Sequence, residues 1–117
     1  MQQPTVYHNP QCSKSNLVIE LIQRQGYQPK IIDYIKSPPT PEVLESFFAQ
    51  IDLKDLVRTN DPLFNELNLS LTDKKSLLQA LHTHPQLLQR PIVVYKNKII
   101  VARPPARVLE LLHVFNA

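Results

Sequence analysis

Proline divides this chain into short pieces. Eleven of its 117 residues are proline and only one, Gly26, is glycine. Proline fixes its own φ angle and has no backbone N–H, so it marks stiff turns and the boundaries of helices and strands. Phosphate-binding loops of the Walker and dinucleotide types need several glycines, and this composition excludes both. The chain must therefore fold as short elements joined by rigid turns.

The first third of the chain predicts a strand, a helix and a second strand. Residues 5–8, "TVYH", are β-branched and aromatic, and residues 30–35, "KIIDYI", form another strand-like run. Between them, four apolar residues recur at helical spacing: Leu17, Val18, Leu21 and Ile22. Gly26 is a natural stop for that helix, and Pro29 follows it. A strand–helix–strand unit predicts parallel pairing.

The middle of the chain predicts several helices. Thr40 can cap a helix whose first position is Pro41. Its buried face is formed by Leu44, Phe47, Phe48 and Ile51. The region from Leu53 to His84 reads as further helical pieces, two of them separated by Pro62. Another apolar face is formed by Leu77, Leu78 and Leu81.

The last third predicts a hairpin and a final helix. Residues 91–95 and 99–102 are strand-like, and Asn97 between them tolerates a tight turn. Pro104 can open a helix with an apolar face of Val108, Leu111, Leu112 and Phe115. This order predicts an α/β fold with a four-stranded mixed sheet whose faces the first and last helices cover. Residues 1–117 form one domain, in which a helical insertion at about 41–88 makes a subdomain.

Bulk properties narrow the class of protein. With 43% hydrophobic and 20% charged residues, the chain is typical of soluble globular proteins. No apolar run approaches the ~20 residues of a membrane span, and the start resembles no signal peptide. A single cysteine cannot form an internal disulfide, which indicates a reducing, intracellular setting. The net charge of +3 is spread over scattered residues, so we expect a solvated surface and no nucleic-acid partner.

The single cysteine, Cys12, lies in "YHNPQCSKS", between the first predicted strand and helix. A lone cysteine is often a small buried hydrophobe. Here its neighbours are polar, and its sulfur lies near a helix N-terminus, where unpaired N–H groups and the helix dipole favour an anion. We therefore expect a lowered thiol pKa and a nucleophilic thiolate. Lys14 is close in sequence and can contribute or be merely solvated.

The segment from Cys12 to Ser15 has the pattern C-x-x-S. In a C-x-x-C motif the second cysteine resolves a mixed disulfide, and serine cannot do this. Because the chain has no other cysteine, redox chemistry at Cys12 needs a thiol from another molecule. A small thiol or a thiol protein is therefore an expected partner.

Arginine side chains offer planar donor forks that match tetrahedral oxyanions. Three stand out by position: Arg58 in "LVRTN", Arg90 before the third predicted strand, and Arg103 after the fourth. Spacing alone is weak evidence for a functional role, because arginines are usually surface salt-bridge or solubility residues. The Arg90–Pro91 bond precedes a buried strand, where it can be cis and direct backbone groups toward the start of that strand.

Four motifs in this order, "YHNPQCSKS", "LVRTN", "RPIVV" and "ARPPARVLELL", resemble the glutaredoxin-dependent arsenate reductase family, most closely its short arsenate-reductase-like branch. The resemblance runs from Val6 to about Leu112. It implies a thioredoxin-like fold with a helical insertion. It also implies roles for site residues: Cys12 as nucleophile, His8 and Ser15 as support for the thiolate, Arg58, Arg90 and Arg103 as oxyanion ligands, and Pro91 as a structural cis-proline.

The resemblance further implies a reaction. Cys12 attacks arsenate, glutathione attacks the resulting adduct, arsenite leaves, and glutaredoxin reduces the remaining mixed disulfide. It implies glutathione as co-substrate, no bound cofactor or metal, a cytoplasmic location and a part in arsenic resistance. The other arsenate reductase type needs C-x5-R, and Val18 at the sixth position after Cys12 excludes it.

The chain departs from the family pattern at Asn16, where arginine is frequent. Loss of this charge would weaken both anion attraction and thiolate stabilisation.

Three other functions stay open: a thiol oxidoreductase of unknown substrate, a non-enzymatic regulator like the Spx proteins that bind RNA polymerase, and a monothiol-glutaredoxin-like role. His82 and His84 form H-x-H, which we interpret as a surface feature because residues two apart on a helix point to different faces.

Overall fold

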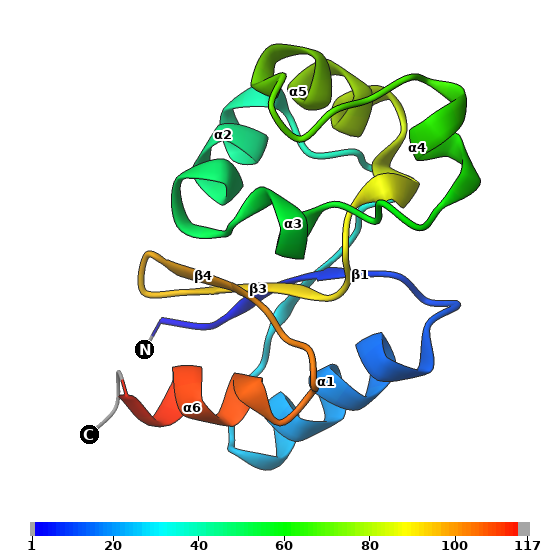
Figure 1. The fold of residues 1–117 in the computed structure, drawn as a ribbon. Coiled ribbons are helices and arrows are strands. Elements are labelled where there is room, and N and C mark those ends of the chain that lie inside the picture. The colour runs from blue at the N-terminus through cyan, green and yellow to red at the C-terminus, as the bar shows by residue number, and fades with distance from the viewer. Residues whose placement is uncertain (1, 115–117) are drawn as a thin grey trace. The chain divides into compact units, whose positions relative to one another are not determined.

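A parallel strand–helix–strand unit opens the fold, as predicted. In the computed structural model, which describes residues 2–114, it comprises β1 (Thr5–His8), α1 (Ser13–Arg24) and β2 (Lys30–Asp33). Strands β1 and β2 pair in parallel, with Thr5 opposite Lys30 and His8 opposite Asp33 (Figure 1). Helix α1 ends before Gly26, whose φ of 90° lies in the left-handed region that glycine adopts without strain.

The predicted hairpin completes the sheet. Strands β3 (Ile92–Tyr95) and β4 (Lys98–Val101) are joined by Lys96 and Asn97, with φ angles of 47° and 66°. Two positive φ angles match the turn that suits the twist of a hairpin. Strand β3 pairs antiparallel with β1, which gives the strand order β2-β1-β3-β4. The predicted four-stranded mixed sheet is confirmed.

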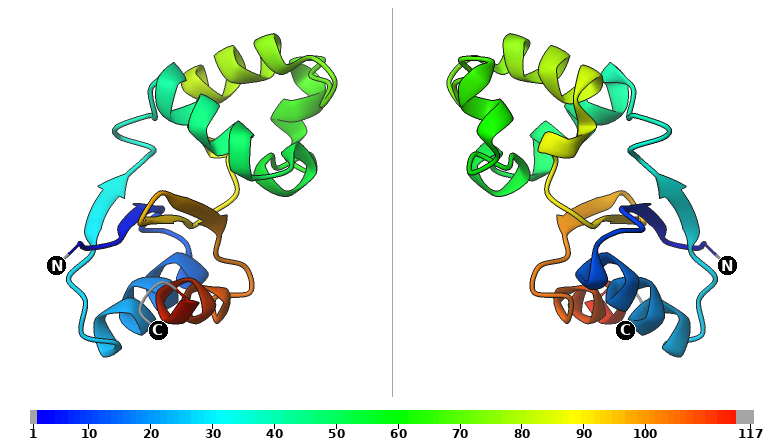
Figure 2. Two further views of the ribbon diagram at one scale, coloured as in Figure 1. Left: turned by 90° about the vertical axis from the view of Figure 1, so that its left-hand side faces the viewer. Right: turned by 90° about the vertical axis from the view of Figure 1, so that its right-hand side faces the viewer.

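Helices α1 and α6 (Arg107–Val114) pack side by side on the same face of the sheet (Figures 1 and 2). The prediction that these two helices cover both faces is therefore wrong. Their contact with the sheet is an apolar cluster that includes Val6, Val18, Ile22, Val93, Val108, Leu111 and Leu112. The predicted α6 face is confirmed for Val108, Leu111 and Leu112. Phe115, the fourth residue of that pattern, lies outside the described residues.

Three details of the sequence prediction are wrong. Leu17 is 41% exposed, and the buried side of α1 is instead Ser15, Val18 and Ile22, because only a narrow stripe of the helix meets the sheet. The second strand ends at Asp33, and the chain then turns. Pro104 does not open α6: its carbonyl accepts the N–H of Arg107, the first helical residue, across a turn.

Residues 35–89 form a separate compact unit, and the rest of the described chain, up to Tyr34 and from Arg90 on, forms the sheet unit. The helical unit contains α2 (Pro41–Gln50), α3 (Leu53–Leu56), α4 (Pro62–Glu66), α5 (Lys74–Thr83) and the 3-10 helix η1 (Pro85–Leu87). The Thr40 hydroxyl caps α2 by accepting the N–H of Val43 at 3.3 Å, as predicted. The expected apolar faces are buried at Leu44, Phe47, Ile51, Leu77 and Leu81, whereas Phe48 and Leu78 are half-buried. Between residues 2 and 114, no helix has the length and apolarity to span a membrane.

Candidate active site

The nucleophile candidate Cys12 is the residue that precedes α1, as the sequence predicted. Strand β1 ends at His8, and a tight turn follows in which the Cys12 N–H donates to the Asn9 carbonyl at 3.0 Å. The Asn9 side chain closes the same turn, since its Oδ1 accepts the Gln11 N–H at 3.0 Å. Cys12 itself is extended, with φ −103° and ψ 118°, which is the backbone conformation of an N-cap residue.

The Cys12 thiol is half-buried, and four polar influences act on it. Partial burial by itself raises the pKa of the thiol. The backbone N–H of Ser15, the guanidinium of Arg90 as donor and as charge, and the backbone N–H of Lys14 all lower it. Together they outweigh burial, so the pKa of Cys12 lies below its ordinary value and the thiolate is favoured. Lys14 acts through its main chain.

The side chains of His8 and Ser15 are in hydrogen-bonding contact next to this turn. The Nδ1 atom of His8 lies 3.0 Å from the Ser15 hydroxyl oxygen, and the same oxygen accepts the Asn9 N–H at 3.2 Å. Ser15 is fully buried and His8 is 8% exposed. Burial lowers the pKa of His8, and the carboxylate of Asp33 on the neighbouring strand opposes this only in part. His8 is therefore a neutral imidazole at pH 7 that anchors the first turn of α1.

Arg90 and Pro91 lie directly before β3, joined by a cis peptide bond. Because β3 pairs with β1 with Ile92 opposite Tyr7, this segment lies beside the end of β1 from which the Cys12 turn departs. The Arg90 guanidinium lowers the pKa of Cys12 both as a donor and as a positive charge. Its Nε atom is buried and has no hydrogen-bond acceptor among the described residues. An oxyanion oxygen would supply such an acceptor.

The other two predicted oxyanion ligands have different surroundings. Arg103 is half-buried after β4, before a second cis bond to Pro104, and its guanidinium is not among the groups that lower the Cys12 pKa. Arg58 belongs to the helical unit, where its Nη1 lies 3.7 Å from the Asp61 carboxylate and 3.5 Å from the Gln86 carbonyl oxygen. Their assignment to oxyanion binding stays a prediction.

Two asparagines of the site were not assigned a role from the sequence. Asn9 holds the turn by the contacts given above. The Asn16 side-chain amide donates to the Pro10 and Cys12 carbonyl oxygens at 3.3 and 3.2 Å. The Asn–Pro pair could have indicated a side-chain-closed turn around Asn9. For Asn16, nothing in the sequence indicates these contacts, because it looks like any other exposed residue of a helix.

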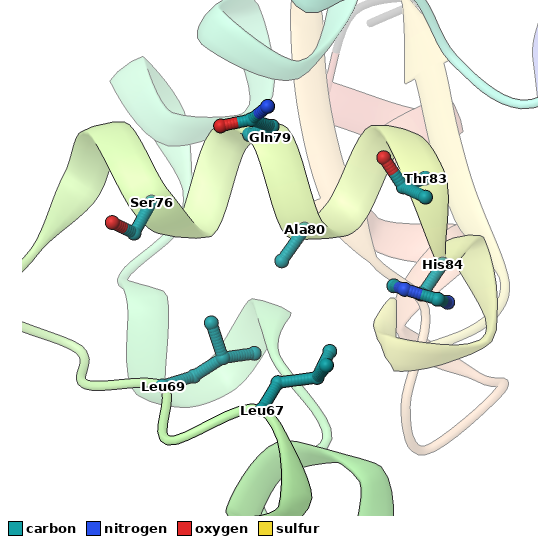
Figure 3. Close-up of a pocket in the computed structure, with 7 residues that line it drawn as sticks. All are labelled: Leu67, Leu69, Ser76, Gln79, Ala80, Thr83 and His84. Atoms are coloured by element: carbon teal, nitrogen blue, oxygen red, sulfur yellow. The ribbon is translucent and has the colours of Figure 1, made fainter.

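The two histidines of the H-x-H pattern differ in their surroundings. His82 donates from Nδ1 to the Pro39 carbonyl oxygen at 2.8 Å. His84 lines a pocket of about 250 Å³ in the helical unit, together with Leu67, Leu69, Ser76, Gln79, Ala80 and Thr83 (Figure 3). Residues 2–114 contain no group of three or more histidine, cysteine or acidic side chains placed to hold a metal ion. None of the predicted site residues lines this pocket.

Comparison with known proteins finds relatives that are similar to this chain in both sequence and structure. The chain is 37% identical to the arsenate reductase of Haemophilus influenzae over 112 residues, 92% of this chain and 97% of that protein. It is 35% identical to the uncharacterized protein YfgD of Escherichia coli over 115 residues, 94% of this chain and 97% of that protein. The solved arsenate reductase from Vibrio cholerae superimposes with a TM-score of 0.86 at 35% identity, covering 92% and 96% of the two chains.

The superposition confirms the predicted thioredoxin-like fold, with its mixed sheet, flanking helices and helical insertion. The model of the ArsC family matches residues 7–111, which include all the predicted site residues. The match therefore extends over both compact units and nearly all of the described chain. This chain belongs to the ArsC family.

Proposed function

We propose that this protein is an arsenate reductase that uses Cys12 as its nucleophile and an external thiol as its reductant. The observation that carries the proposal is the position of Cys12, directly before α1 and beside the Arg90–Pro91 segment. There the Ser15 and Lys14 amides and Arg90 lower the pKa of its thiol. A thiolate at a helix N-terminus is the reactive form of cysteine. Family membership and the arsenate reductase of Haemophilus influenzae support the choice of substrate.

The unsatisfied Nε of Arg90 also supports the proposal. This buried Nε is a donor without an acceptor among the described residues, and a buried unsatisfied donor is costly. An oxygen of a tetrahedral oxyanion bound beside Cys12 would satisfy it. The same guanidinium would then hold the substrate and stabilise the attacking sulfur. Arg58 and Arg103 are proposed to complete the binding of the oxyanion, as the resemblance implies.

The reaction proceeds in three steps. The Cys12 thiolate forms a bond to arsenic, and one arsenate oxygen leaves as water after protonation. The thiolate of glutathione then attacks the Cys12 sulfur of this adduct, the sulfur–arsenic bond breaks with its electron pair going to arsenic, and the two sulfurs become joined as a mixed disulfide. Their two electrons convert arsenic(V) to arsenic(III), which leaves as arsenite. The mixed disulfide must be reduced by an external thiol, because Cys12 is the only cysteine of the chain and no internal disulfide can form. Glutaredoxin is the proposed source of that thiol, as the family resemblance implies.

No bound cofactor or metal is needed in this scheme, and glutathione is a co-substrate. Glutaredoxin and reduced glutathione are intracellular, so we propose a cytoplasmic location and a contribution to arsenic resistance. We also propose that residues 1–117 act as one thioredoxin-like domain with its insertion at about 41–88. We propose no nucleic-acid partner, because the net charge of +3 is spread over scattered residues.

A coupled assay with arsenate, glutathione and glutaredoxin tests the proposal. Wild-type protein should form arsenite, omission of glutaredoxin should stop turnover after one cycle, and Cys12→Ser should be inactive. Ser13→Ala, a change at the exposed neighbouring residue, should retain activity and serves as the control. Activity in Cys12→Ser would refute the role of the nucleophile. An inactive wild type with a low thiol pKa would instead favour a thiol oxidoreductase with another substrate.

A further inference from the structure

Asn16 makes three hydrogen bonds to two carbonyl oxygens of the turn that holds Cys12, residues 9–12. It follows Ser15 in the first turn of α1, and its side chain is exposed. The side-chain Nδ2 donates to the Pro10 carbonyl oxygen at 3.3 Å and to the Cys12 carbonyl oxygen at 3.2 Å. Its backbone N–H also donates to the Cys12 carbonyl, at 3.1 Å. One residue therefore ties the helix to the turn at two carbonyls.

Within residues 2–114, the Cys12 side chain makes no hydrogen bond that would hold the sulfur in place at the start of the helix. An N-cap side chain normally accepts a hydrogen bond from the second or third amide of its helix. The Cys12 thiol makes no cap hydrogen bond of regular geometry within the described chain, although the Lys14 and Ser15 amides are close enough to lower its pKa. The position of the sulfur therefore depends on the backbone of the turn.

Asn16 adds no formal charge to the site. Its neutral side-chain amide engages the Pro10 and Cys12 carbonyl oxygens, and Arg90 is the cation whose charge lowers the Cys12 pKa. Asn16 therefore acts on the thiolate through the geometry of the turn.

We propose that Asn16 is a positioning residue for the Cys12 thiolate. This inference rests on the proposed function, in which Cys12 is the nucleophile. By holding the Pro10 and Cys12 carbonyls, Asn16 keeps the sulfur in reach of the Ser15 amide and the Arg90 guanidinium. The exposed asparagine thereby replaces, by geometry, part of the thiolate stabilisation that a cationic side chain at this position would give by charge.

The test measures the rate of alkylation of Cys12 by iodoacetamide between pH 5 and 9, in wild type, Asn16→Leu and Asn16→Asp. Asn16→Leu removes the donor at nearly constant size, and Asn16→Asp replaces the donor with a charged acceptor. Gln23 is exposed on α1 seven residues later, about two helical turns away, so Gln23→Leu and Gln23→Glu are the matched controls. Urea unfolding of each variant checks that the comparison is made between folded proteins.

Both Asn16 variants should raise the apparent thiol pKa, with Asn16→Asp raising it more. A rise of about half a pKa unit slows alkylation about threefold at a pH below the pKa. The Gln23 variants should titrate like wild type. If Asn16→Leu and Asn16→Asp are folded and both also titrate like wild type, the inference is wrong. Because no arsenate is used, an inactive wild type in the arsenate assay would refute the proposed function without affecting this result.

Discussion

The imidazole Nδ1 of His8 lies 3.0 Å from the hydroxyl oxygen of Ser15, joining the end of β1 to the first turn of α1. The backbone N–H of the same serine is one of the groups that lower the Cys12 pKa. His8 therefore acts on the thiolate through Ser15, by fixing the amide that faces the sulfur. This buried contact makes thiolate stabilisation depend on how the strand and the helix pack.

Replacement of Ser15 by alanine should be costly. Its buried hydroxyl serves both His8 and the Asn9 N–H, and both would lose a hydrogen-bond partner. An unsatisfied buried polar group costs about 1–3 kcal/mol. Urea unfolding should therefore show Ser15→Ala destabilised by about that amount, against about 0.5 kcal/mol or less for exposed Ser13→Ala. Equal losses for the two variants would contradict the contact.

The neutral state of His8 should appear in the pH dependence of stability. Because burial lowers the folded pKa below the ordinary value of about 6.5, the unfolded chain binds the proton first as pH falls. The free energy of unfolding should thus decrease as pH drops below about 6.5, toward the folded pKa. His8→Gln removes this contribution and should lose less stability than wild type between pH 7.5 and pH 5.5. Parallel profiles would show that His8 is not desolvated.

Arg90→Met should raise the pKa of Cys12, because it removes both a donor to the sulfur and a nearby positive charge. Alkylation near pH 7 should slow, and the dissociation constant for arsenate or sulfate should rise. Arg24→Met removes one charge from the exposed far end of α1, where Arg24 pairs with Glu20, and serves as control. If the two variants alkylate alike and bind the anions alike, Arg90 has no special place at the site.

The buried stripe of α1 can be tested with two substitutions. Ile22 is fully buried in the cluster beneath the sheet, whereas Leu17 is 41% exposed. Ile22→Ala should destabilise by about 2–5 kcal/mol. Leu17→Ala should cost only about 0.5 kcal/mol. Denaturant titration of both variants distinguishes them, and a large loss for Leu17→Ala would restore the wider apolar face that the sequence predicted.

The parts of the site that are determined by residues adjacent in the sequence could be predicted. The strand-like run, the Asn–Pro turn and the helical period place Cys12 at a helix start from local sequence alone. The hairpin and the mixed sheet follow from the order of elements and from the turn-forming Asn97. The local pattern does not predict which residues of α1 are buried. It selected four apolar residues, but the polar Ser15 is buried as well, because His8 and Asn9 satisfy its hydroxyl.

Contacts between distant segments could not be derived from local pattern. Arg90 comes close to Cys12 because β3 pairs with β1, and only the register of that pairing fixes which residues meet. The Asn16 contacts depend on a side-chain rotamer, which sequence does not specify. At Pro104, residue preference favoured a helix start, whereas the chain there makes a cis bond and a turn before α6.

The reaction depends on a Cys12 thiol that ionises at a lower pH than an ordinary cysteine. The most direct measurement is the pH dependence of Cys12 alkylation in the wild-type protein, with the same thiol in urea-unfolded protein as reference. The folded profile should have its midpoint below that of the unfolded chain, because the Ser15 and Lys14 amides and Arg90 outweigh burial. A folded midpoint at or above the unfolded one would contradict it.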